Sequence, residues 1–315
     1  MGRSHLRKLA MIEKTQASAG VINALCFDID DLAYSLKTKN GLGFSSEYLV
    51  EKETYGLLEF LDGLGLKATM FVPGYVAEHF PALIRAITDG GHEVGSHGYE
   101  HIIAEQLQQK RFRNDVVRSK KRLEDILSRE VSTYRSPSWG ITPRTPWAYD
   151  VLIEAGYSVD NTAQPALLKH LGRSPSDMVP FRYKESLTVI PVTSFRFLNR
   201  SVPFNGGLFC AYVPIAFQIR YYASLNEKGM AFNYFCHPYE FNPGGANRQV
   251  WKCHSFAATM YGMYFGIYRY YLTRLAGRFR FGPLKEAYGS YIEPKNESHV
   301  KDLAGGEKNM IEGMA

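Results

Sequence analysis

Apolar runs of strand length alternate with helix-length segments along the first hundred residues of this chain. Residues 21–29 and 67–72 are rich in strand-forming side chains, and residues 46–64 between them carry apolar side chains near the helical period. A second helix is expected over 75–88, and a third short strand follows at 92–94. This order predicts parallel βαβ units and therefore an α/β fold.

The same alternation continues to about residue 236. A long, highly charged helix is expected over 105–128 and a shorter one over 146–155. In parallel α/β barrels the active site lies at the carboxyl ends of the strands, so the residues that follow each strand are the first candidates for function. Further strands are expected at 131–134, 157–159, 187–192 and 231–236.

Two histidines, His97 and His101, follow the third expected strand with three residues between them. On a helical turn, residues at i and i+4 share a face, so both imidazoles can reach one metal ion. Three carboxylates, Asp28, Asp30 and Asp31, follow the first strand at the same edge. Two imidazoles and one carboxylate leave positions open for water and substrate, which is typical of a catalytic rather than a structural metal.

The composition is ordinary for a globular protein of 315 residues, with 45% hydrophobic and 22% charged residues. The net charge of +6 is modest and the Lys and Arg residues are scattered, so we expect no nucleic-acid partner. An anionic glycan or glycolipid fits this charge equally well. The four cysteines form no C-x-x-C pair. Nothing in the sequence indicates an oligomeric state.

No secretory signal is visible, because no apolar segment follows the basic residues near the N-terminus. The aromatic-rich stretch 256–272 is interrupted by Arg269 and is too short to cross a membrane, so we expect a helix that faces the core. We therefore expect a cytoplasmic protein without a transmembrane segment, and peripheral membrane contact stays open. The expected domain plan is a polar lead-in over 1–20, one catalytic domain over 21–293 and a disordered tail over 294–315.

Five motifs stand at the expected strand ends, in chain order. They are Phe-Asp-Ile-Asp-Asp (27–31), Ser-His-Gly-Tyr-Glu-His (96–101), Arg-Ser-Pro-Ser-Trp (135–139), Tyr-Ser-Val-Asp-Asn (157–161) and His-Pro-Tyr-Glu (237–240). As an ordered set they resemble the signature motifs of polysaccharide deacetylases with the NodB homology domain, carbohydrate esterase family 4.

With the closing segment Phe279–Leu284, the set is most similar to the subfamily found in exopolysaccharide loci of bacteria with exosortase systems. The similarity spans roughly residues 24–287. It implies a distorted (β/α)7 barrel that removes N-acetyl groups from amino sugars, with an N-acetylated glycan as its partner.

The resemblance also implies a metal held by one Asp and two His, here His97 and His101. Family members with adjacent aspartates use one as base and one as ligand, but this chain has an extra residue, as in related Asp-x-Asp deacetylases. Alternation along a strand directs Asp28 and Asp30 to one face and Asp31 to the other. We assign Asp28 as base and Asp30 as ligand, with Asp31 as the fallback ligand if a bulge reverses the strand end. The expected metal is zinc, although cobalt, nickel or iron would also bind.

Five further residues take roles through the same resemblance. His237 would donate a proton to the leaving amine, Arg135 would pair with the base, and Asp160 would support the site from the neighbouring strand. Trp139 and Tyr239 would form apolar walls for the acetyl methyl group or the sugar face. Each also has a plain structural alternative as a surface ion pair, a turn residue or a core aromatic.

Two other functions compete with the deacetylase prediction. Barrels of this type also hydrolyse small amides, as in allantoinase-like relatives, and an inactive homologue could bind glycans without cleaving them. The aromatic, Gly-rich stretch 204–212 favours an extended glycan groove, and each catalytic position that can be aligned carries a competent residue type. The leading prediction is a metal-dependent deacetylase acting on a polysaccharide or its lipid-linked precursor in exopolysaccharide synthesis. The sequence leaves the sugar and its linkage open.

Overall fold

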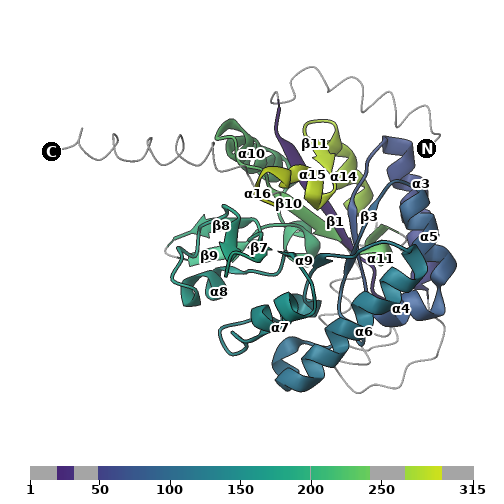
Figure 1. Cartoon of the computed structure of the whole chain (residues 1–315). Helices are drawn as coiled ribbons and strands as arrows, with labels where there is room; N and C mark the ends of the chain where they lie inside the picture. Colours follow the sequence, from purple (N-terminus) through teal and green to yellow (C-terminus); the bar gives the residue numbers. More distant parts are fainter. Residues whose placement is uncertain (1–19, 32–48, 199, 242–266, 293–315) are drawn as a thin grey trace, which may run out of the picture.

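The structure is a computed structural model that describes residues 20–31, 49–198, 200–241 and 267–292 (Figure 1). Its strands are β1 (Ile22–Asp28), β2 (Thr69–Val72), β3 (Glu93–Ser96), β4 (Thr133–Tyr134), β5 (Val159–Asp160), β6 (Phe181–Tyr183), β7 (Leu187–Val189), β8 (Ser194–Phe197), β9 (Arg200–Pro203), β10 (Asn233–Cys236) and β11 (Arg280–Gly282).

One mixed, curled sheet holds nine of these strands. Seven described strands are parallel and lie in the order β10–β1–β2–β3–β4–β5–β7; β6 adds an antiparallel edge, and β11 pairs in parallel with β1. The α/β fold predicted from the sequence is therefore confirmed, as an incomplete barrel whose parallel strands carry their carboxyl ends to one edge.

The seam between β7 and β10 is bridged by the segment 190–206 instead of a further ladder. The backbone N–H of Phe235 in β10 donates to the carbonyl of Asn205 at 2.7 Å, and Gly206 forms a parallel β-bridge with Phe235. The Asn233 side chain contacts the start of the segment through the Thr193 backbone. Strands β8 and β9 form an antiparallel hairpin that leaves the sheet within this segment.

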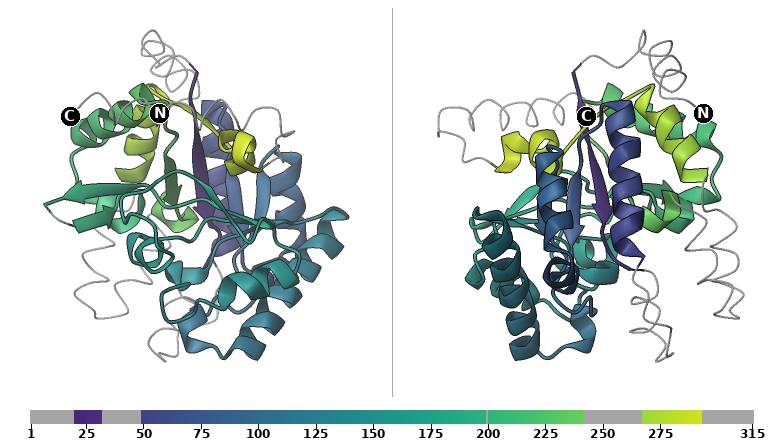
Figure 2. Two further views of the ribbon diagram at one scale, coloured as in Figure 1. Left: turned by 60° about the vertical axis from the view of Figure 1, so that its left-hand side comes forward. Right: turned by 90° about the vertical axis from the view of Figure 1, so that its right-hand side faces the viewer.

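Helices surround the sheet in the order expected for βαβ units (Figures 1 and 2). The predicted helix over 75–88 is divided in two, because Pro81 lacks an N–H and begins a new helix after the non-helical Phe80. The helices are α3 (Val50–Leu64), α4 (Gly74–His79), α5 (Pro81–Asp89), α6 (Gln109–Leu127), α7 (Ala148–Glu154), α8 (Pro165–His170), α9 (Gly207–Ala211), α10 (Ile215–Glu227), α11 (Pro238–Phe241), α14 (Ile267–Ala276), α15 (Leu284–Ala287) and α16 (Gly289–Ile292).

Strand β1 runs through the centre of the core and sorts its side chains by alternation. Leu25 and Phe27 are fully buried in the larger apolar cluster, which α3 and α14 share. Ala24 and Cys26 are fully buried in a second cluster with Phe71 of β2. Since successive side chains of a strand point to opposite faces, Asp28 points to the same face as Ala24 and Cys26. This alternation determines on which face of the sheet the candidate site lies.

Several predicted features fall outside the described residues. These are most of the lead-in, the tail from 293 onward, and residues 256–266 of the aromatic stretch. The rest of that stretch lies in α14, where Tyr268, Tyr271 and Leu272 are buried, as expected for a core-facing helix. Among the helices of the described ranges, none is long and apolar enough to cross a bilayer.

Candidate active site

Arg135 and Asp28 form a buried ion pair at the carboxyl ends of β4 and β1. Nη1 of Arg135 lies 2.6 Å from Oδ1 of Asp28, and Arg135 is fully buried. Its Nη2 donates to Oδ1 of Asn161, and its guanidinium lies 4.1 Å from the centre of the Phe71 ring. A charge at this depth is tolerated only when it is paired and hydrogen-bonded. The contact is the pair that the family resemblance implied between Arg135 and the residue assigned as base.

Asp160, which the sequence nominated as a supporting acid, contacts its own strand end. Its carboxylate accepts hydrogen bonds from the backbone N–H and the hydroxyl of Thr162, at 2.9 and 2.6 Å. Burial raises the pKa of Asp160 to about 6, although these bonds oppose the rise. The direct contact with Arg135 comes instead from the next residue, Asn161, whose amide also donates to the Ile190 carbonyl at 2.9 Å. The sequence placed Asn161 at the end of the fourth motif but gave it no role in the site.

His97 and His101 lie beside the carboxylates that end β1. Nε2 of His101 is 3.0 Å from Oδ2 of Asp30, and Nε2 of His97 is 3.9 Å from Oδ2 of Asp28. The two imidazole centres are 5.1 Å apart. Nδ1 of His97 lies 2.8 Å from the carbonyl oxygen of Arg135. Because a carbonyl can only accept, Nδ1 carries the proton and Nε2 presents its lone pair to the carboxylates.

The protonation states of these groups suit a cation-binding site. Burial lowers the pKa of His97 to about 4, against the opposing effect of Asp28, so the ring is neutral near pH 7. Burial alone would raise the pKa of Asp30, but the imidazoles of His237 and His101 outweigh it and lower this pKa below its usual range. The edge therefore offers one ionised carboxylate, Asp30, and one neutral imidazole, His97.

The donor set at this edge suits a divalent metal by its chemistry. No group of three or more His, Cys, Asp or Glu side chains in the described ranges is already spaced to hold a metal ion. The donors occur as two close pairs, His101 with Asp30 and His97 with Asp28. Their chemistry nevertheless fits the ion, because the set contains two imidazoles and a carboxylate. A backbone carbonyl orients the His97 ring, and metal-ligating histidines usually have such a hydrogen bond at their other ring nitrogen.

Asp31, the fallback ligand, has a different neighbour. Its Oδ2 accepts the backbone N–H groups of Leu49 and Val50, at 2.8 and 3.2 Å. It therefore satisfies otherwise open donors at the start of α3. The alternation that placed Asp28 and Asp30 on one face agrees with this geometry, and Asp30 is the carboxylate beside His101.

A buried carboxyl that sequence reasoning missed lies near this cluster. Glu53 on α3 is only 2% exposed, and neither carboxyl oxygen has a hydrogen-bond partner in the described structure. Burial raises the pKa of Glu53 to about 8, and the nearby Asp31 and Asp30 add to the rise. Its position on the apolar face that includes Val50 and Leu57 was the available signal.

His237 follows β10 and is held by two residues of its own turn. Its backbone N–H donates to Oε2 of Glu240 at 2.8 Å, and its Nδ1 lies 3.3 Å from Oε1 of the same carboxylate. The Tyr239 ring stacks on the imidazole with centres 4.7 Å apart. Burial alone would lower the pKa of His237, but Glu240 and Asp30 raise it to about 9. The imidazole is therefore protonated near pH 7, unlike His97.

The two predicted aromatic walls differ in exposure. Trp139 is half-buried, with its ring centre 5.1 Å from that of Phe235 and 5.0 Å from the Arg135 guanidinium carbon. Tyr239 is only 4% exposed and packs against His237. Trp139 is thus the aromatic of the pair with accessible surface, whereas the described contact of Tyr239 supports the histidine.

The turn between the two site histidines is held from α6. Asp115 accepts the backbone N–H groups of Tyr99 and Glu100, at 2.7 and 2.9 Å. The Ser119 hydroxyl donates to the carbonyl of Gly98 at 2.9 Å. We call Asp115 and Ser119 the α6 clamp. Sequence reasoning missed both residues, because two inward-facing polar side chains do not stand out in so charged a helix.

The α6 clamp fixes a backbone that is strained. His101 has φ of 53°, the left-handed region that L-residues rarely adopt. Such a conformation costs roughly 1–2 kcal/mol outside glycine and persists only where the surroundings hold it. Hydrogen bonds to the three residues before His101 supply that hold, and they determine where its imidazole lies.

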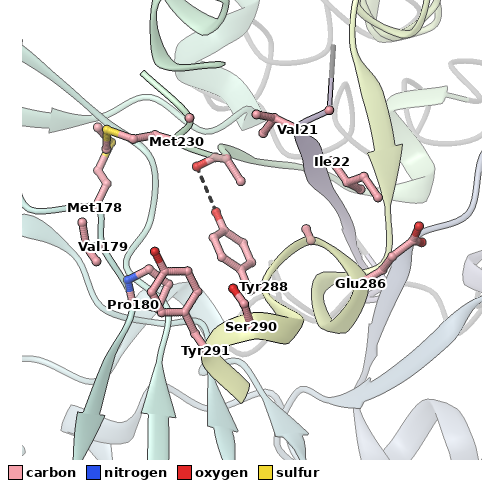
Figure 3. A pocket seen from close by; sticks show the side chains of 14 residues that line it. Val21, Ile22, Met178, Val179, Pro180, Met230, Glu286, Tyr288, Ser290 and Tyr291 are labelled. Atoms are coloured by element: carbon pink, nitrogen blue, oxygen red, sulfur yellow. Dashed lines mark hydrogen bonds between the residues drawn. The ribbon is translucent and has the colours of Figure 1, made fainter. Parts of the chain in front are cut away.

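A separate cavity of about 330 Å³ lies at the amino ends of β1 and β10 (Figure 3). Its walls include Ile22, Met178, Met230 and Tyr288, and the Tyr288 hydroxyl donates to the Ala231 carbonyl at 3.2 Å. This cavity is at the opposite end of β1 from Asp28. It is therefore distinct from the candidate active site.

Comparison with known families divides the chain into two matched regions. Residues 30–159 match the family described as "Polysaccharide deacetylase", and residues 162–289 match "Domain of unknown function (DUF3473)". Both regions share one sheet, since β5 pairs with β7. The candidate site also draws on both, with His101 in the first region and His237 in the second.

Two curated relatives match part of the chain. It is 29% identical over 106 residues to the peptidoglycan deacetylase of Helicobacter pylori, covering 34% of this chain and 35% of that protein. It is 33% identical over 73 residues to a peptidoglycan-N-acetylglucosamine deacetylase of Bacillus cereus, covering 23% and 25%. The alignments thus span no more than 35% of either relative's length.

A solved structure supports the fold over a longer span. A Mycobacterium smegmatis protein assigned as a polysaccharide deacetylase superposes with a TM-score of 0.58 at 22% identity, covering 86% of this chain and 91% of that one. At that identity the likeness concerns the architecture alone.

Proposed function

Since the chain carries a polysaccharide deacetylase domain followed by a DUF3473 region, we propose that it is a metal-dependent hydrolase that removes N-acetyl groups from an amino sugar. The observation that carries the proposal is the convergence of Asp28, Asp30, His97 and His101 at one edge of the sheet, with Arg135 pairing with Asp28. These five ionisable side chains are at most 5% exposed, so contact with water does not explain their presence. Buried clusters of ionisable groups are typical of functional sites.

Asp30, His97 and His101 would hold the ion, zinc in the first instance, with cobalt, nickel or iron as alternatives. When bound, such an ion polarises the acetyl carbonyl and makes water a stronger acid. The chain orients its donors for this role. The Arg135 carbonyl fixes the His97 ring, and the α6 clamp fixes the backbone that presents His101.

The proton transfers then follow from the remaining residues. Asp28, oriented by Arg135, accepts a proton from the attacking water as the new C–O bond forms. His237, protonated beside Glu240, gives its proton to the amide nitrogen as the C–N bond breaks. The products are acetate and the free amine of the sugar. Trp139, the half-buried aromatic of the pair, would line the space for the acetyl methyl group.

The substrate we infer is an N-acetylated glycan of exopolysaccharide synthesis, either the polymer or its lipid-linked precursor. The curated relatives are peptidoglycan deacetylases by name, which supports an N-acetylated amino sugar as the reacting unit. The segments His237–Glu240 and Phe279–Leu284 support the exopolysaccharide class through their resemblance to that subfamily.

The test is acetate release from a panel of N-acetylated oligosaccharides with added zinc or cobalt. Asp28→Asn keeps the shape of the side chain but cannot accept the proton, so kcat should fall by about 10²–10⁴-fold. The matched control is Asp31→Asn, because asparagine caps a helix about as well as aspartate and this variant should keep its activity.

Other outcomes would refute the proposal. Cleavage of small cyclic amides without acetate release from any glycan would indicate an allantoinase-like enzyme. Glycan binding with no turnover, unchanged by Asp28→Asn, would indicate an inactive binding protein. An equal loss of acetate release in Asp28→Asn and Asp31→Asn would show that Asp28 has no role as base beyond that of the carboxylate at the start of α3.

A further inference from the structure

The charges of one stretch of the chain are unusually one-sided. From Ser186 to Asn226 there are three arginines and no Asp, Glu or Lys, in a chain that has 31 acidic residues. The three are Arg196, Arg200 and Arg220. This stretch includes the β8–β9 hairpin and most of α10, which contact each other through the Phe195, Phe217 and Tyr221 rings, so its positive charge lies on neighbouring elements.

The same elements present apolar side chains to solvent. Phe197 is 62% exposed and Leu198 is 81% exposed, at the point where β8 turns into β9. Phe217, on the first turn of α10, is 43% exposed. Single exposed apolar residues are common, but an aromatic and an aliphatic side chain together at a hairpin turn are a candidate contact site. We call Arg196, Phe197, Leu198, Arg200, Phe217 and Arg220 the hairpin surface.

The arginines of the hairpin surface have no carboxylate partner within the described residues. Arginines elsewhere on the surface do: Arg111 lies 2.9 Å from Glu100, and Arg144 lies 2.6 Å from Glu105. Within the described residues, no carboxylate therefore neutralises the guanidinium groups of the hairpin surface.

The hairpin is firmly supported at its base. The Phe195 ring contacts those of Phe217 and Tyr221, with centres 5.4 and 5.1 Å apart, and the Tyr221 hydroxyl donates to the Ser194 carbonyl. In Figure 1 the β8–β9 hairpin lies at the left side of the molecule, away from the central strand β1. Since the base is packed and the turn is not, the turn can meet a flat partner without rearranging the core.

We propose that the hairpin surface binds an anionic lipid bilayer, with Phe197 and Leu198 inserted among the acyl chains and the arginines paired with headgroup phosphates. Apolar tips flanked by cations are the features that hold peripheral proteins at such an interface. An acidic glycan would pair with the arginines but gains little from an exposed leucine. A second copy of the chain would bring the same three arginines to a self-complementary contact, where like charges repel.

The proposal is independent of the reaction at the candidate active site, and it is tested by flotation of the full chain with vesicles. We expect binding to phosphatidylglycerol-containing vesicles and much weaker binding to pure phosphatidylcholine. The double variant Phe197→Ser/Leu198→Ser should bind anionic vesicles at least about tenfold more weakly. Arg196→Gln/Arg200→Gln should lose about fivefold per arginine and lose most of the preference for anionic lipid.

Matched controls separate the hairpin surface from general effects of charge and apolarity. Val117→Ser/Tyr270→Ser removes exposed apolar side chains from α6 and α14, and Arg111→Gln/Lys121→Gln removes the same charge from α6. Both should bind vesicles like the unaltered chain. Equal losses in controls and hairpin variants would overturn the proposal.

Three further results would also overturn it. One is absence of flotation with any vesicle. Another is binding to an acidic polysaccharide but not to lipid. The third is a dimer in solution that dissociates in Phe197→Ser/Leu198→Ser, which would make this face a contact between copies. None of these outcomes bears on acetate release, so failure here leaves the proposed function standing.

Discussion

The candidate active site and the hairpin surface use charge in opposite ways. In the site, Arg135 is fully buried and hydrogen-bonded to Asp28 and Asn161. Arg196 and Arg200 are exposed beside the hairpin turn and have no carboxylate partner among the described residues. Burying a charge costs several kcal/mol unless it is paired, so the partners in the site are structurally required. The exposed arginines carry no such requirement. Substitutions should therefore destabilise the fold at the first region and alter only binding at the second.

The largest effect on stability is expected from Arg135→Met. The variant leaves Asp28 buried without its partner, which should lower the free energy of unfolding by about 3–5 kcal/mol in urea titrations. The control is Arg111→Met, which breaks an exposed pair with Glu100 and should cost no more than about 1 kcal/mol. Similar losses in the two variants would erase the contrast between buried and exposed charge.

The α6 clamp gives the next effect, on metal affinity. Asp115→Ala leaves the N–H groups of Tyr99 and Glu100 without their acceptor, so the His101 backbone loosens. Zinc affinity measured by competition with a chelating dye should fall about 10–100-fold, as for other groups that orient metal ligands. Asp125→Ala, on the same helix but paired at the surface with Lys121, should leave affinity unchanged. Equal zinc affinities in Asp115→Ala and Asp125→Ala would show that the α6 clamp does not position His101.

A pH effect on stability comes from His92, away from the site. The His92 ring is buried and accepts the Ala68 N–H, and burial, with Lys67 acting in the same direction and Asp62 against, lowers its pKa from 6.5 to about 4. Because the unfolded chain takes up the proton first, this contribution to stability is present above pH 6.5 and is lost as the pH falls toward 4.

His92→Gln should flatten the pH dependence of unfolding in that window. The expected change is up to about 1.4 kcal/mol per pH unit relative to the unaltered chain, measured in urea at a series of pH values. A variant with the same slope as the original chain would show that His92 titrates normally in the fold.

The smallest effect on stability is expected at the hairpin surface. Phe197→Ser/Leu198→Ser removes exposed side chains, so the free energy of unfolding should change by no more than about 0.5 kcal/mol. Urea titration and the vesicle assay on this one variant separate a change in stability from a change in lipid binding. A loss of several kcal/mol would mean that the turn is part of the core, and the comparison would fail.

The sequence predicted the features that depend on local order along the chain. Alternating strand and helix patterns gave the parallel sheet, and alternation along β1 placed Asp28 and Asp30 on one face. The break at Pro81 was missed, because the apolar pattern continues through it. The β8–β9 hairpin was also missed, because its turn starts at Leu198 and leucine does not predict a turn.

Contacts between distant elements could not be predicted from sequence alone. Asn161 meets Arg135, and Asp115 meets the turn before His101, only after the strands and α6 have packed. Asp160 was expected to support the site, but the direct hydrogen bond to Arg135 comes from the next residue, Asn161. One position along a strand changes the direction of a side chain, and the sequence does not fix that position at a strand end.

The central claim is that Asp30, His97 and His101 hold a catalytic divalent ion. The most direct test is elemental analysis of the full chain after zinc loading and desalting, compared with His97→Ala and His101→Ala. We predict one ion per chain in the unaltered protein and almost none in either variant, with all three folded by circular dichroism. Equal metal content in the three proteins, or no bound metal in any of them, would contradict the account.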